Sequence, residues 1–137
     1  MAVKNFMAKK VVTAPSDATV KELRDYFNNL KIHHIVVVDQ GKVKGVISDR
    51  DILKCTSPFL GTPSENERDR YTLTKKAHQI MAREVISVKP DAQVREAAML
   101  MLDKHISCLP VIDWYGKLVG ILTWKDILGA IFHKDDK

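Results

Sequence analysis

Two short stretches of the sequence each carry a hydroxyl, a basic group and a carboxylate close together. The three groups are Ser48, Arg50 and Asp51 in one stretch, and Thr123, Lys125 and Asp126 in the other. A hydroxyl can donate a hydrogen bond to a phosphate oxygen, and a carboxylate can accept hydrogen bonds from both hydroxyls of a ribose. The basic group between them could neutralise a polyphosphate. At the start of a helix, where free N–H groups favour anions, this combination suits a nucleotide.

The same atoms also fit a purely structural role. Ser/Thr-x-x-Asp resembles a capping box, in which a hydroxyl and a carboxylate satisfy the free N–H groups at the start of a helix. Spacing alone favours this cap over a ligand contact, and the two roles are compatible. Both interpretations place residues 48–51 and 123–126 at the beginning of a helix.

Motifs of enzymes and of metal sites are missing from the sequence. It has no Gly-x-Ser-x-Gly elbow, no Walker-type loop and no His-Glu-x-x-His motif. His33 and His34 are adjacent, and neighbouring residues of a strand point to opposite faces, so they cannot easily share one metal. Cys55 and Cys108 lie far apart and form no CxxC pair, which is typical of reduced thiols. We therefore predict no catalytic residues, no metal site and no obligatory cofactor.

Hydrophobic periodicity predicts the elements that position these groups. One helical stripe contains Val20, Leu23, Phe27 and Leu30, and a second contains Val94, Ala97, Ala98 and Met101. Thr19 and Glu22 predict a capping box at the start of the first helix. The run at 35–38 predicts a buried strand, joined by a tight turn to a second strand at 43–47, and strands joined in this way are antiparallel.

The two stretches belong to an internal repeat. The segments of the first copy, each followed by its echo, are 6–13 and 80–87, 17–22 and 91–96, 35–39 and 109–113, and 45–53 and 120–128. The only change of length between them is one residue in the turn before the last segment, and turns tolerate such changes. Each copy is therefore predicted as strand, helix, strand, strand, helix, an α/β (α+β) unit.

Each copy resembles a cystathionine-β-synthase (CBS) domain, over residues 6–54 and 80–131. The resemblance rests on the apolar strand that ends in Asp39 or Asp113, the turn after it, and Gly-x-x-Ser/Thr-x-x-Asp at the last helix. Each motif alone is weak, but two ordered copies with matching spacing are a strong signal. Many family members have proline where this chain has Val36, whereas the second copy keeps Pro110. We therefore expect a differently shaped backbone in the first copy.

This resemblance implies a Bateman module with two motifs packed sheet to sheet about a pseudo-twofold axis. The clefts of such modules often bind AMP, ADP or ATP. The implied ligand contacts are Thr13, His33, His34, Ile35, Val36, Ile47, Ser48, Arg50 and Asp51 in the first copy, and Ser87, Cys108, Leu109, Pro110, Leu122, Thr123, Lys125 and Asp126 in the second. Thr13 and Ser87 could equally be turn residues, and the two histidines could be ordinary residues at a strand boundary.

Composition narrows the class of protein and its partners. The chain of 137 residues is 45% hydrophobic and 28% charged, which is too apolar for disorder. It has no apolar run long enough to span a bilayer and no secretory signal at its N-terminus, so we expect no membrane contact and a cytoplasmic location. The net charge of +5 suits a phosphate-bearing ligand. Because there is no dense basic stripe, nucleic acid is not favoured as a partner.

The sequence leads to one preferred function. We expect a stand-alone regulatory module, with motifs at 1–54 and 80–131, a linker at 55–79 and a polar tail at 132–137. It would bind an adenine nucleotide and act in trans on a regulated protein that the sequence does not name. The alternative is a ligand-free dimerisation or interaction scaffold. A homodimer is expected in either case, since helix faces around Phe27 and Met101 would otherwise be left uncovered.

Overall fold

The structure is a computed structural model in which residues 1–132 are described. It divides this part of the chain into two units. The first-copy unit comprises residues 12–85, and the second-copy unit comprises residues 1–11 together with 86–132. Residues 133–137, the greater part of the tail predicted at 132–137, lie outside the described residues.

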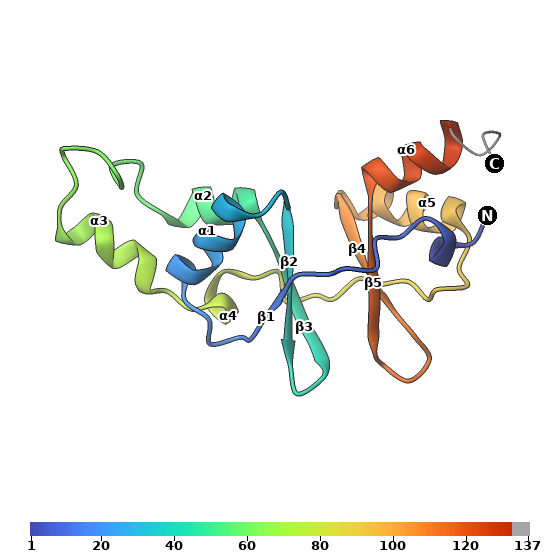
Figure 1. Cartoon of the computed structure of the whole chain (residues 1–137). Coiled ribbons are helices and arrows are strands. Elements are labelled where there is room, and N and C mark those ends of the chain that lie inside the picture. The colour runs from blue at the N-terminus through green and yellow to red at the C-terminus, as the bar shows by residue number, and fades with distance from the viewer. Residues whose placement is uncertain (133–137) are drawn as a thin grey trace. The chain divides into compact units, whose positions relative to one another are not determined.

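A three-stranded sheet forms the centre of the first-copy unit (Figure 1). Its strands are β1 (Thr13–Ala14), β2 (His34–Asp39) and β3 (Lys42–Ser48), with helix α1 (Val20–Asn29) between the first two and α2 (Asp49–Cys55) after the third. β1 runs parallel to β2, and β2 runs antiparallel to β3. The predicted order of strand, helix, strand, strand, helix is confirmed here.

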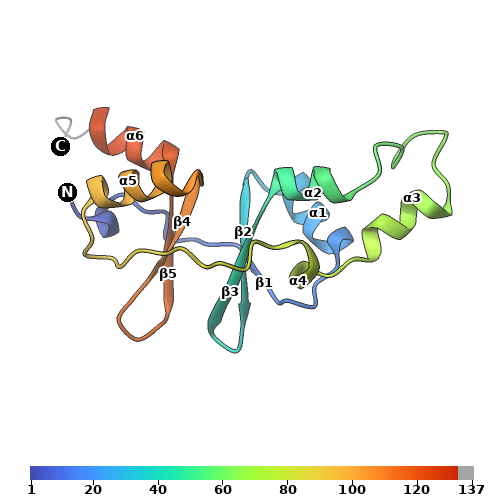
Figure 2. The ribbon, with the colours of Figure 1, turned by 180° about the vertical axis from the view of Figure 1, so that it is seen from behind.

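The second-copy unit repeats this arrangement with a two-stranded sheet (Figure 2). It contains α5 (Val94–Lys104), β4 (Cys108–Ile112), β5 (Leu118–Thr123) and α6 (Trp124–Phe132), and β4 and β5 are antiparallel. The predicted first strand is reduced to a single parallel bridge between Val88 and Val111.

Pro110 explains this shorter first strand. In the first copy the N–H of Val36 donates to the carbonyl of Val12 at 3.1 Å, which holds Thr13 beside Val36. Pro110 occupies the position of Val36 and has no N–H to donate. The ladder of the second copy therefore begins only where Val88 donates to the Pro110 carbonyl, at 3.1 Å. The expected difference in backbone between the copies is thus present.

Each unit has its own hydrophobic core. Fully buried side chains include Leu23, Ile35 and Ile47 in the first-copy unit and Met101, Leu109 and Leu122 in the second.

Two expectations about helix surfaces need correction. The predicted helical stripe ends before Leu30, which has extended backbone and is exposed. Met101 is buried in the core, so the uncovered apolar surface of α5 is formed by Met99 and Leu102 instead.

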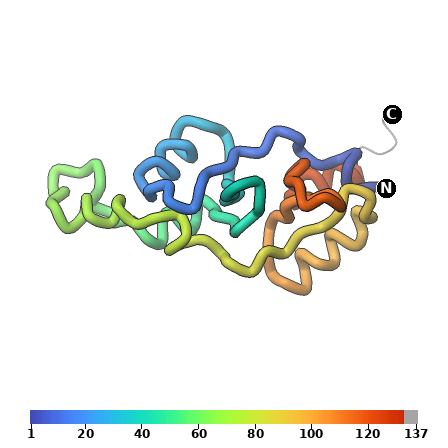
Figure 3. Tube along the Cα trace, turned by 90° about the horizontal axis from the view of Figure 1, so that it is seen from below, coloured from blue at the N-terminus to red at the C-terminus, as the bar shows by residue number. Residues whose placement is uncertain are grey.

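The first residues of each copy pack onto the sheet of the other copy's unit. Ala8 and Ile121 exchange two backbone hydrogen bonds, each 2.9 Å long, and Val3 is fully buried in the second-copy core. In the same way Ala82 lies against β3 and donates to the carbonyl of Val46 at 3.1 Å. Figure 3 shows the N-terminal end beside the elements of the second-copy unit. The compact units therefore cut across the sequence repeat.

Two glycines permit this close approach of the backbone. A Cβ atom on Gly45 would lie 2.5 Å from the Ala82 carbonyl oxygen, and one on Gly120 would lie 2.5 Å from the sulfur of Met7. Neither position leaves room for a side chain.

The predicted linker contains ordered structure. It holds α3 (Glu67–Tyr71), the 3-10 turn η2 (Thr72–Thr74) and the start of α4 (Ala77–Ile80), while the 3-10 turn η1 (Val3–Asn5) lies near the N-terminus. The Ser57 hydroxyl donates to the buried carboxylate of Asp69 at 2.6 Å. This hydrogen bond, helped by one from the Asn66 N–H, lowers the pKa of Asp69.

In residues 1–132, no helix is both long and apolar enough to cross a membrane.

Candidate functional site

The predicted hydroxyl–carboxylate pair of the first copy forms a cap at the start of α2. Ser48 is the N-cap residue, and its N–H and hydroxyl both donate to Oδ2 of Asp51, at 2.8 and 3.1 Å. The Asp51 N–H donates back to the Ser48 hydroxyl oxygen at 3.2 Å. The structural role predicted from spacing is therefore confirmed. Oδ1 of Asp51 takes no part in this cap.

The second copy reproduces the geometry at the start of α6. The N–H and the hydroxyl of Thr123 donate to Oδ2 of Asp126, at 2.9 and 3.1 Å. Each N-cap residue also ends a strand, so the sheet fixes its backbone while the helix fixes the acid three residues later. Each copy thus offers a hydroxyl and a carboxylate held side by side on rigid elements.

The basic residues between the paired groups extend into solvent. Arg50 and Lys125 are both exposed, and neither forms an ion pair within the described part of the chain. Thr13 and Ser87 are exposed as well, Thr13 on β1 and Ser87 just before the bridge at Val88. These four side chains are available to a ligand in solution.

Seven of the implied strand contacts are buried, Cys108 among them. Ile35 pairs with Ile47, and Leu109 pairs with Leu122, and all four side chains belong to the core of their own unit. Those four side chains are committed to packing, so only their main-chain groups remain for ligand contact. Val36 and Pro110 are also buried, and alternation along a strand directs them to the sheet face opposite these cores.

The two histidines have different surroundings. His33 is exposed, and its Nδ1 lies 2.8 Å from Oδ2 of Asp49. His34 is half-buried at the start of β2, opposite Ser48 in the sheet. Burial lowers the pKa of His34, although the nearby Asp49 carboxylate partly opposes this shift. His34 therefore favours its neutral form close to the ligand-facing residues predicted in this copy.

Burial disfavours the thiolate form of both cysteines. Burial raises the pKa of the Cys108 thiol to about 12, so the thiol stays protonated at neutral pH. Burial also raises the pKa of Cys55. A thiol held in its protonated form is a poor nucleophile and a poor metal ligand. Among residues 1–132, no three metal-ligating side chains come together.

Sequence reasoning missed a groove in the first-copy unit. It has a volume of about 700 Å³ and lies between α1, α2 and the loop that follows α2. A partial signal for it exists, because Arg24 and Asn28 recur at helical spacing beside the apolar stripe of α1, and Lys31 follows just after the helix. These polar residues could have been recognised as part of one wall of a site. Of the predicted contacts, only His33 lines this groove.

Comparison with known proteins gives a consistent result. A family model described as CBS domain matches residues 3–57 and 77–133. A CBS domain-containing protein of Dictyostelium discoideum is 36% identical over 131 residues, which cover 94% of this chain and 90% of that protein.

Two solved structures share the fold along almost the whole chain. The CBS domain pair of protein MJ0100, in complex with 5′-methylthioadenosine and S-adenosyl-L-methionine, is 31% identical, with a TM-score of 0.79 and 98% of each chain covered. The structure of CBSX2 in complex with AMP is 26% identical, with a TM-score of 0.77 and 98% of each chain covered.

Proposed function

This chain belongs to the CBS domain family, and we propose that it is a regulatory CBS pair that binds an adenine nucleotide. AMP, ADP or ATP would bind beside the helix start of one copy or of both. The ribose would be held by Asp51 or Asp126, and phosphate oxygens by Ser48 or Thr123 together with Arg50 or Lys125.

The observation that carries this proposal is the repeated geometry of the two caps. In both copies the acid accepts two hydrogen bonds on Oδ2, which leaves Oδ1 outside the cap. A carboxylate oxygen outside the cap can accept a hydrogen bond from a ribose hydroxyl while the helix stays capped. A purely structural cap would not need the exposed cation that follows the hydroxyl by two residues in each copy.

The ligand class is supported by the two similar structures. One binds 5′-methylthioadenosine and S-adenosyl-L-methionine, and the other binds AMP. Adenosine is the part that these three ligands share. We therefore place the ribose contact at the centre of the proposal, since every adenosine ligand with free ribose hydroxyls can make it.

Binding can regulate a partner only if two states of the protein differ in ligand affinity. We propose that the nucleotide biases a homodimer or a surface offered to a regulated protein. The side chains that favour a second copy are exposed apolar residues on the helices of the second-copy unit, namely Met99, Leu102, Leu128 and Ile131. A symmetric contact would remove them from water.

The alternative is an interaction scaffold that binds no nucleotide, and the same exposed apolar residues favour it. A thermal-shift panel of AMP, ADP, ATP, GMP and adenine separates the two functions. Nucleotide sensing predicts a rise in the melting temperature with adenosine phosphates that grows with ligand concentration. A scaffold predicts the same melting temperature throughout the panel. Light scattering with and without AMP then reports whether the ligand alters the oligomer.

A further inference from the structure

We propose that the groove between α1 and α2 is a second ligand site, for an amphipathic carboxylate with an aliphatic body. Every residue that lines it lies within the first-copy unit. The proposal does not depend on the nucleotide assignment, because His33 is the only residue shared by the two sets. A volume of about 700 Å³ lies in the usual range of small-molecule sites.

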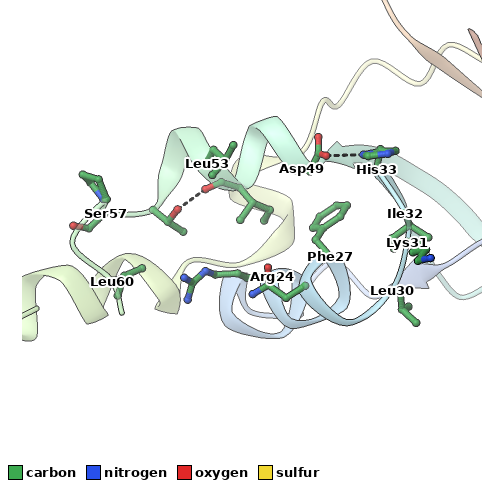
Figure 4. A pocket seen from close by; sticks show the side chains of 14 residues that line it. Arg24, Phe27, Leu30, Lys31, Ile32, His33, Asp49, Leu53, Ser57 and Leu60 are labelled. Atoms are coloured by element: carbon green, nitrogen blue, oxygen red, sulfur yellow. Dashed lines mark hydrogen bonds and ion pairs between the residues drawn. The ribbon is translucent and has the colours of Figure 1, made fainter. Parts of the chain in front are cut away.

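The groove has an apolar centre. Figure 4 shows the Phe27 ring standing between α1 and α2, with Leu53 on α2 to its upper left and Leu60 at one end. Ile52 and Leu60 are almost fully buried, while Leu53 remains 75% exposed at the rim. An aliphatic chain placed here would cover Leu53 and exchange water for contact with Phe27.

The charges along the groove are mostly positive. Arg24 and Lys31 are the two basic residues that line it, the His33 imidazole lies beside them, and Asp49 is the only acidic residue of the lining. The Asp49 carboxylate already accepts from His33 at 2.8 Å. Neither Arg24 nor Lys31 forms an ion pair in the part of the chain that the structure describes. The groove therefore offers two cations without a carboxylate partner, and an anionic ligand would supply one.

The cations lie at the two ends of the groove. In Figure 4 the Arg24 side chain extends toward Leu60, while Lys31 lies at the opposite end, near the His33 ring. Arg24 is half-buried, so its guanidinium is less screened by water than that of a fully exposed arginine. A planar guanidinium matches a carboxylate in a bidentate pair, which favours Arg24 as the anchor for the head group.

The wall at the Arg24 end is held in place by hydrogen bonds. The Thr56 hydroxyl donates to the carbonyl of Ile52 at 2.7 Å. The Ser57 N–H donates to the hydroxyl oxygen of Thr72 at 3.2 Å, and the Ser57 hydroxyl donates to the buried Asp69. The loop after α2 is thus fixed to the linker helix behind it. A wall that is fixed before binding lowers the entropy that a ligand must lose.

Calorimetry with octanoate, octanamide and acetate on the full chain tests this site. Octanoate has both the charge and the aliphatic body, octanamide has only the body, and acetate has only the charge. We expect octanoate to bind at least about fivefold more tightly than octanamide, and acetate to give no heat of binding. Arg24→Gln should weaken octanoate about tenfold and leave octanamide unchanged.

The matched control is Lys21→Gln, which removes a cation of the same helix outside the groove. Lys21 lies 3.9 Å from Asp25, and both side chains are exposed. Lys21→Gln should bind octanoate like the wild type. The affinity for AMP should be the same in the wild type, Arg24→Gln and Lys21→Gln. When octanoate is added to the wild type, the amide chemical shifts that change should be those of residues 24–33 and 49–60.

Three results would overturn the proposal. The first is equal binding of octanoate and octanamide by the wild type, or no binding of octanoate at about 10 mM. The second is a set of shifted amides outside the groove. The third is a change of molecular mass on adding octanoate that Arg24→Gln does not alter, which would assign this surface to a second copy of the chain.

Discussion

Asp51 receives both the N–H and the hydroxyl of Ser48 on one carboxylate oxygen, at 2.8 and 3.1 Å. The first turn of α2 is therefore capped by side chains of the chain itself. Because the other oxygen stays outside the cap, Asp51 can have two roles that are measured separately. One role contributes to the free energy of unfolding, and the other contributes to ligand affinity.

Replacing Asp51 by Ala removes the carboxylate of the cap. We expect the free energy of unfolding, measured by urea denaturation without ligand, to fall by about 0.5–2 kcal/mol. The control is Asp25→Ala on α1, whose carboxylate is exposed and lies 3.9 Å from Lys21. Its effect should stay below about 0.5 kcal/mol. Equal losses in the two variants would contradict the assignment of Asp51 as a cap.

Gly45→Ala should be strongly destabilising, because the new methyl group would lie 2.5 Å from the Ala82 carbonyl oxygen. The backbone of Ala82 would have to move away from β3, at a cost of about 1–3 kcal/mol. Gly129→Ala in α6 is the matched control, since nothing lies within 4 Å of its added Cβ. There alanine should stabilise the helix by about 0.5–1 kcal/mol. If Gly45→Ala leaves the free energy of unfolding unchanged, the segment around Ala82 does not pack against Gly45 as described.

The local parts of this fold were predictable from sequence, and the long-range parts were not. Ser48 and Asp51 are three residues apart, so their types and spacing were enough to predict the cap. Ala8 and Ile121 lie at opposite ends of the chain, and no periodicity in either segment indicates that they pair. The sequence therefore did not predict that the first residues of each copy pack onto the sheet of the other copy's unit.

Side-chain burial was predicted less well than the elements that carry it. The helical stripe at Met101 was correct, but the uncovered surface expected around it is formed by Met99 and Leu102, while Met101 is in the core. Periodicity gives the apolar face of a helix, whereas the packing partners decide which of its members are covered. The groove beside Phe27 was missed for a similar reason, because one of its walls is a loop without periodicity.

Stability should depend on pH through His34. Burial lowers its pKa in the folded state below the ordinary value of 6.5, so the unfolded chain binds the proton more tightly. Stability is then fully present above pH 6.5 and is lost as pH falls through 6.5 toward the lower pKa of the folded state. We expect urea midpoints to fall more between about pH 7.5 and 5.5 in the wild type than in His34→Gln. The same fall in both proteins would assign the pH dependence to other groups.

The two nucleotide sites should differ in affinity. The first copy offers Arg50 beside the His33–Asp49 pair, whereas the second offers Lys125 beside Trp124. Because the charges and volumes differ, calorimetry with AMP should give two distinct dissociation constants. Asp126→Ala should remove only one of the two binding steps. Titration data that fit two identical sites would contradict this prediction.

The central claim is that Asp51 and Asp126 hold ribose hydroxyls, and the most direct test compares AMP with 2′,3′-dideoxy-AMP on the full chain. Hydrogen bonds to a charged group are worth about 1.5–3 kcal/mol each. Wild type should therefore bind AMP about tenfold or more tightly than the dideoxy analogue. The Asp51→Ala and Asp126→Ala variants should lose this preference at their own sites. If wild type binds both ligands with equal affinity, the ribose assignment is wrong, and the two acids are helix caps alone.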